Sequence, residues 1–175
     1  MPIAQSRVTA IAFHSAGPGA LPLKPLGRQA NQGAASRFFH RLFGGGGSGL
    51  RYYLVSGGTG VQTGELDVGG ATGTDVYAPV DGTVVGIAPT VLDGKRYGVR
   101  LDLQPSGSPS VVLSLTHLRI DPSLAVGDAV IASSSKLGRV LDFSGVEQQS
   151  LARYTPDAGN HVAIQVHPAA SLSVP

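Results

Sequence analysis

The fold class follows from two neighbouring segments, YGVRLDLQ at residues 97–104 and SVVLSLTH at residues 110–117. In the first segment Val99, Leu101 and Leu103 share one face, and the residues between them are polar. This period of two is typical of a half-buried antiparallel strand. A Gly-Ser-Pro stretch separates the segments. The pair therefore predicts a β-hairpin and a mainly β, antiparallel protein.

The rest of the composition agrees with many short strands and turns. Five further segments are rich in β-branched residues or alternate between apolar and polar residues, and each is bounded by Gly, Pro, Ser or Asp. They are Arg51–Ser56, Thr83–Ala88, Ala129–Ala132, Leu137–Phe143 and Asn160–His167. The 175 residues include 25 Gly and 12 Pro but no Cys, which excludes disulfides and cysteine zinc sites. No apolar run approaches the roughly 18 residues of a membrane span, so we expect no transmembrane segment. From residue 50 onward, only Glu147–Tyr154 has a helical pattern.

Residues 1–49 read as a basic, Gly- and Pro-rich arm ahead of a β domain at residues 50–175. Within the arm, residues 34–43 (AASRFFHRLF) predict a short helix and residues 44–49 a flexible glycine linker. Residues 1–64 carry a net charge of +6, and the remainder carries −4. We expect the arm to dock on its own body, on a protein partner or on a second copy of the chain. We do not expect nucleic acid as a partner, because the basic residues are diffuse.

The N-terminus has no continuous apolar stretch of signal-peptide length. With Met1 as the native start, we expect a cytoplasmic protein.

Five short motifs occur in an order that resembles the lysostaphin/LytM-type zinc endopeptidases of peptidoglycan. They span roughly residues 69–168: Gly73-x-Asp75, Ala78-Pro79-Val80-Asp81-Gly82-Thr83-Val84-Val85, Thr116-His117-Leu118, Val126-Gly127-Asp128-Ala129-Val130 with Gly138-Arg139-Val140, and Gly159 to Val166 (GNHVAIQV). The resemblance implies an antiparallel β-sheet domain of the duplicated hybrid motif type, with one zinc in a groove. It implies zinc ligands in an H-x-G-x-D-like motif and at the second His of H-x-H, and two further catalytic histidines.

The resemblance fails at the metal ligands. Asp75 is retained, but Ala71 and Ala163 stand where the family has its two histidine ligands. A catalytic zinc normally has three protein ligands and a water. His117 and His161 match the family's histidines that do not bind the metal. No other histidine is expected to rescue the site: His167 lies about 13 Å beyond Ala163 along the strand, and His14 and His40 lie on the arm.

The sequence therefore predicts a non-catalytic binding or assembly module, for cell-wall glycopeptide or a protein partner, with no cofactor. Its groove residues would be Asp75, His117, His161 and Gln165. Purely structural roles stay open, since Asp75 could bond turn amides and His117 could be a partly buried strand-end histidine. One alternative is a zinc endopeptidase with an atypical metal site. A minor alternative is a biotinyl- or lipoyl-type carrier, for which Lys136 is the candidate lysine.

Overall fold

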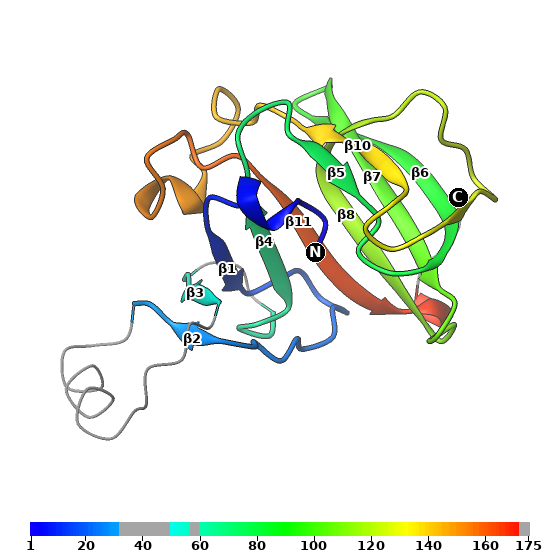
Figure 1. The fold of residues 1–175 in the computed structure, drawn as a ribbon, viewed down its shortest axis with the longest axis horizontal. Helices are drawn as coiled ribbons and strands as arrows, with labels where there is room; N and C mark the ends of the chain where they lie inside the picture. The colour runs from blue at the N-terminus through cyan, green and yellow to red at the C-terminus, as the bar shows by residue number, and fades with distance from the viewer. Residues whose placement is uncertain (32–49, 57–59, 172–175) are drawn as a thin grey trace.

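The computed structural model describes residues 1–31, 50–56 and 60–171, and β-strands dominate this part of the chain (Figure 1). The strands are β1 (Ile11–His14), β2 (Arg28–Gln29), β3 (Arg51–Leu54), β4 (Glu65–Gly69), β5 (Asp75–Tyr77), β6 (Gly82–Leu92), β7 (Lys95–Pro105), β8 (Val111–Ile120), β9 (Ala129–Val130), β10 (Lys136–Val140) and β11 (His161–Pro168). The helices described are 3-10 turns: η1 (Gln5–Arg7), η2 (Ser150–Arg153) and η3 (Ala169–Ser171). Within these residues no helix has the length and apolar character needed to cross a membrane. The predicted mainly β class is confirmed.

The sheet follows the strand order β2-β3-β1-β4-β11-β8-β7-β6-β9, while β10 pairs with both β8 and β5. Neighbouring strands are antiparallel except where β3 pairs with β1 and with β2. In Figure 1, β5 and β10 lie in front of β8, β7 and β6. The C-terminal strand β11 lies in the middle of the sheet, between β4 and β8.

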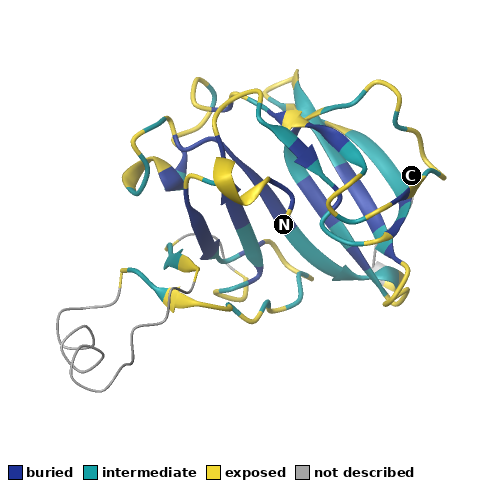
Figure 2. Ribbon diagram, viewed as in Figure 1, coloured by how far each residue is buried: buried dark blue, intermediate teal, exposed yellow. Residues whose placement is uncertain are grey.

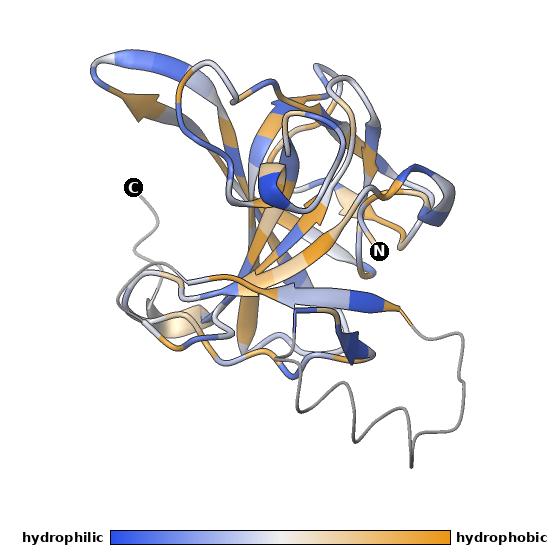
Figure 3. Cartoon of the chain, turned by 90° about the vertical axis from the view of Figure 1, so that its left-hand side faces the viewer, coloured by the Kyte–Doolittle hydropathy of each residue, from blue (hydrophilic) through white to orange (hydrophobic). Residues whose placement is uncertain are grey.

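The main core lies between the sheet and the β5–β10 pair (Figure 2). Leu101 and Leu103 of β7 and Leu115 of β8 are fully buried, and Val76 and Leu137 meet them from β5 and β10. Apolar and polar residues alternate along the strands (Figure 3). Complete burial of one such side chain contributes about 1.5–3 kcal/mol, so this face fixes the register of the long strands.

The predicted strands and hairpin are present. Each of the seven expected segments contains a strand, and β7 and β8 pair antiparallel around the Gly-Ser-Pro turn. Strands β1, β2, β4 and β5 were not expected. They are only two to five residues long, too short for a clear pattern.

The two predicted helices, at residues 147–154 and 34–43, have different outcomes. Within residues 147–154 only Ser150–Arg153 form a helical turn, η2. Gln149 at its N-cap is extended and makes no side-chain capping hydrogen bond. The expected helix at 34–43 and the linker at 44–49 lie outside the described residues.

The first 16 residues contribute to the sheet and to its core. Strand β1 lies between β3 and β4, and Ala12 on it is fully buried. Ile3 is 1% exposed within the main core, and the preceding carbonyl of Pro2 accepts a hydrogen bond from the Tyr77 amide at 2.7 Å. This segment, which the sequence places in an arm ahead of residues 50–175, is thus part of the sheet and its core.

Candidate functional site

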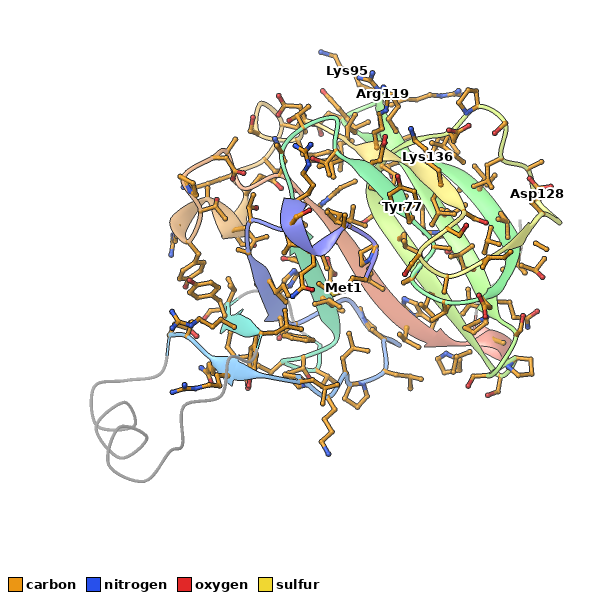
Figure 4. All side chains as sticks on the ribbon, viewed as in Figure 1. Met1, Tyr77, Lys95, Arg119, Asp128 and Lys136 are labelled. Carbon is orange, nitrogen blue, oxygen red and sulfur yellow. The ribbon has the colours of Figure 1, made fainter. Side chains whose placement is uncertain are left out.

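Asp75 lies at the start of β5, where two basic side chains of β10 hold its carboxylate. Lys136 Nζ is 2.6 Å and Arg139 Nε is 3.1 Å from the same oxygen, Oδ1. The antiparallel register produces this arrangement, since Arg139 is the partner of Asp75 and Lys136 that of Tyr77. Figure 4 shows Lys136 and Tyr77 side by side on these strands. The hydrogen bonds from Lys136, and next from Arg139, lower the pKa of Asp75.

The zinc site implied by the resemblance does not fit these residues. The methyl groups of Ala71 and Ala163 have no lone pair to offer a metal. Ala163 is 1% exposed and lies in register between Asp67 of β4 and Thr116 of β8. The one retained ligand, Asp75, already faces two cations of the chain. Metal chemistry at this position is therefore not supported.

His117 and His161, the two histidines that the sequence predicts for the groove, lie in contact. His117 Nδ1 is 3.2 Å from His161 Nε2, and the ring of Phe143 lies 4.4 Å from that of His117, centroid to centroid. His161 Nδ1 lies 3.0 Å from the Gly159 carbonyl oxygen. A carbonyl only accepts, so this Nδ1 carries the hydrogen and Nε2 of a neutral His161 accepts from His117.

Burial, and next the neighbouring His161, lower the pKa of His117 to about 4. His117 is therefore neutral at physiological pH. Its backbone has φ of +61°, which a non-glycine residue rarely adopts. This conformation lets its carbonyl oxygen accept a hydrogen bond from Leu141 at 3.0 Å. Strain of this kind is retained where the surroundings fix it.

Sequence reasoning missed a second cluster beside His161. His14 Nε2 lies 3.2 Å from Asp67 Oδ2 and 3.5 Å from Glu65 Oε1, and His161 Nε2 lies 3.5 Å from Asp67 Oδ1. The hydrogen bonds to Asp67, and next to Glu65, raise the pKa of His14 to about 11. The expectation that His14 stays away from the groove is wrong, because β1 pairs with β4 and brings His14 opposite Glu65. His40 lies outside the described residues.

One signal in the sequence could have revealed this cluster. Glu65 and Asp67 are the first acidic residues of the chain, and their spacing of two places both on one face of a strand. They follow 64 residues without an acid, so a basic or histidine partner from that segment was a reasonable expectation.

The remaining predicted residue, Gln165, extends this polar cluster along β11. Its Nε2 donates a short hydrogen bond to Glu65 Oε2, and its Oε1 accepts one from His167 Nε2 at 3.0 Å. No hydrogen bond or ion pair within residues 1–31, 50–56 and 60–171 joins Asp75 to His117, His161 or Gln165. The four predicted groove residues thus belong to two separate groups, Asp75 alone and the three others together.

The segment between β10 and β11 covers the histidine group. Phe143 is 1% exposed against His117, and Leu151 is fully buried against Ala10 and Ala12. Ser150 Oγ donates to Asp67 Oδ2 at 3.4 Å. Asp67 is consequently fully buried and His161 is 5% exposed. His14 and His117 beside them remain partly exposed.

The Asp75 side, in contrast, opens into a pocket of about 590 Å³. Arg7, Arg139 and Tyr77 line it, together with Ala4 and residues 71–75. Arg7 makes no ion pair among the described residues. The pocket lining therefore includes Arg7 in addition to Arg139, which pairs with Asp75.

Solved structures similar to this chain include lysostaphin. No family model matches the sequence, and no curated protein matches it. The solution structure of lysostaphin matches with a TM-score of 0.44 and 19% sequence identity over 62% of this chain. The match covers 37% of the lysostaphin chain, so this chain corresponds to little more than a third of that protein.

Proposed function

We propose that this chain is a non-catalytic binding module of the lysostaphin/LytM-like type. The observation that carries the proposal is the ion pair in which the Lys136 ammonium lies 2.6 Å from Asp75 Oδ1. Asp75 is the one acidic ligand left from the zinc-binding pattern, and a cation of the chain itself stands against it. Hydrolysis of this type needs a metal as Lewis acid and a bound water of lowered pKa. Without the ligands at Ala71 and Ala163, binding is the function that these residues favour.

The pocket beside Asp75 suggests the class of ligand. Its volume of about 590 Å³ lies within the range of roughly 300–1,000 Å³ usual for small-ligand sites. Arg7 and Arg139 offer planar donor groups that suit a carboxylate. We take the ligand to be a cell-wall glycopeptide whose peptide carries a free carboxylate. Docking of a partner or a second copy through residues 34–43 rests on the sequence pattern alone.

Co-sedimentation of the purified chain with isolated peptidoglycan tests this proposal. We expect wild-type protein to be retained without release of soluble fragments. Arg7→Ala and Arg139→Ala should each reduce retention. Lys95→Ala is the matched control, because it removes one charge at the far end of β7, outside the pocket (Figure 4). Equal retention of all four proteins, or no retention of the wild type, would reject a glycopeptide role for the pocket.

A second candidate is a metallo-endopeptidase with a displaced metal site. The observation that favours it is the position of Asp67, Glu65 and His14 beside His161 and His117. Zinc-dependent release of peptidoglycan fragments, lost in His14→Gln, would support this candidate. The carrier alternative has no comparable support, since Lys136 is engaged with Asp75 rather than free at a hairpin tip.

A further inference from the structure

The cluster around Asp67 has the composition of a metal site, and it lies where β1, β4 and β11 run side by side. His14 lies against Oδ2 of Asp67 and also against Glu65, and His161 lies on the side of Oδ1 of Asp67. We propose that His14, Glu65 and Asp67 bind one divalent transition-metal ion of the zinc class, with His161 as a fourth ligand. This site differs from the family positions at Ala71, Asp75 and Ala163.

The spacing of the ligand atoms suits such an ion. In a tetrahedral zinc shell with metal–ligand bonds of about 2.0–2.1 Å, neighbouring ligand atoms lie about 3.3–3.4 Å apart. Here His14 Nε2 lies 3.2 Å from Asp67 Oδ2 and 3.5 Å from Glu65 Oε1. Donor atoms of these three residues all lie within 4.8 Å of one another. No other group of three such residues meets this condition in the described part of the chain.

A separate observation is the unsatisfied carboxylate of Asp67. Its side chain is fully buried, yet Oδ1 accepts no hydrogen bond, although His161 Nε2 lies 3.5 Å away. A buried carboxylate oxygen without a partner is destabilising and therefore rare. An ion bound between Asp67 and the imidazoles would satisfy this oxygen.

The outer contacts hold both imidazoles as they are held in metal sites. His14 Nδ1 lies 2.9 Å from the Ser15 carbonyl oxygen, and His161 Nδ1 lies 3.0 Å from that of Gly159. Each Nδ1 therefore carries a hydrogen, and each Nε2 faces Asp67. A hydrogen bond from the second ring nitrogen to a backbone carbonyl is a regular feature of metal-binding histidines.

Glu65 is oriented in the same way. Gln165 binds its Oε2 and leaves Oε1 toward His14. The carboxylate thus has one oxygen fixed and the other free for the ion. Nε2 of His161 would have to give up its hydrogen bond with His117 in order to bind the metal. His161 is therefore the fourth ligand rather than one of the first three.

Calorimetric titration of chelator-treated full-length protein with zinc chloride tests the site. We expect saturable binding of one ion per chain. His14→Gln and Glu65→Gln should each weaken binding at least about tenfold, because loss of even an outer partner commonly costs 10–100-fold. Asp75→Asn is the matched control and should leave affinity within about twofold, a change expected when no ligand or ligand-orienting group is altered. Circular dichroism checks that each variant is folded.

A measurement on the unmodified chain guards against variants that fail to fold. With cobalt(II) in place of zinc, the NMR signals of His14 and Asp67 should shift or broaden strongly, while those of Asp75 change less. No saturable zinc binding by the wild type would overturn the proposal. Binding that Asp75→Asn abolishes and His14→Gln preserves would also overturn it. Peptidoglycan retention is a separate readout, so this proposal and the binding function fail independently.

Discussion

Asp75 and Asp67 are both acidic residues of short strands, but the chain surrounds them in opposite ways. Asp75 on β5 is 41% exposed and is paired with a lysine and an arginine. Asp67 on β4 is fully buried, lies between two histidines and keeps one oxygen without a hydrogen bond. The difference shows that the groups packed around a carboxylate, rather than its place in a sequence motif, decide whether it is free to bind a cation.

The largest expected effect is a difference in the free energy of unfolding between Asp67→Ala and Asp75→Ala. Asp67→Ala leaves His14 without its closest partner in a largely buried place, and removal of one member of such a pair costs about 3–5 kcal/mol. Asp75→Ala should have a much smaller effect, because its ion pairs are open to water. Urea denaturation with chelator present gives both free energies of unfolding. Equal losses would mean that the burial of Asp67 does not matter energetically.

The next prediction concerns Ile3, which precedes the pocket residue Ala4. Ile3 is 1% exposed and packs in the main core. Ile3→Ala should lower the free energy of unfolding by about 2–5 kcal/mol, as for other large-to-small core changes. Leu26→Ala serves as control, because Leu26 is 76% exposed. A neutral Ile3→Ala would show that the first residues dock only loosely on the sheet.

The third prediction sharpens the comparison by rebuilding the family site. Ala71→His with Ala163→His supplies two nitrogen ligands, but Lys136 is still ion-paired with the Asp75 carboxylate. We therefore expect little zinc affinity from the double variant and a clear gain when Lys136→Met is added. The titrations use a His14→Gln background so that the Asp67 cluster does not contribute.

A histidine at position 163 should also lower the stability of the fold. Ala163 is buried in register with Asp67, and a larger side chain in a packed place costs about 1–3 kcal/mol. Thermal unfolding of each variant must accompany the titrations. If the double variant binds zinc as tightly as the triple variant, Lys136 is not the obstacle.

The smallest expected effect is a local change in acidity. Lys136 is the main cause of the lowered pKa of Asp75, so Lys136→Met should raise that pKa toward its ordinary value. A lowered pKa in the folded state stabilises the fold above the ordinary pKa, and this contribution is lost as the pH falls. An NMR titration of the carboxyl signals measures the change. Asp142 is the internal control, because its pKa is lowered mainly by hydrogen bonds from Ser144, and Lys136 does not contribute.

The sequence predicts the long strands well because their alternation extends over many residues. In β7, Leu101 and Leu103 are buried as expected. Asp102, on the opposite face, is also buried, since Ser114 donates to it at 2.7 Å and Arg100 lies against it. The hydrogen bond from Ser114 to Asp102 joins two neighbouring strands, and the alternation within one strand cannot predict such a contact.

The site was predictable in part for the same reason. Strand parity places His161 and Gln165 on one face, and the motif order places His117 near them. The Asp67 cluster depends on the pairing of β1 with β4, and β1 has only four residues. Its long-range pairing, rather than any local propensity, brings His14 within 3.2 Å of Asp67.

The central position of β11 has a consequence for how the protein is made. Its neighbours are β4, some 95 residues earlier in the chain, and β8. The sheet therefore stays open as two separate parts until residues 161–168 have left the ribosome. Pairings between such distant segments slow folding and leave strand edges exposed meanwhile. We expect the chain to be most prone to aggregation in the interval before β11 inserts.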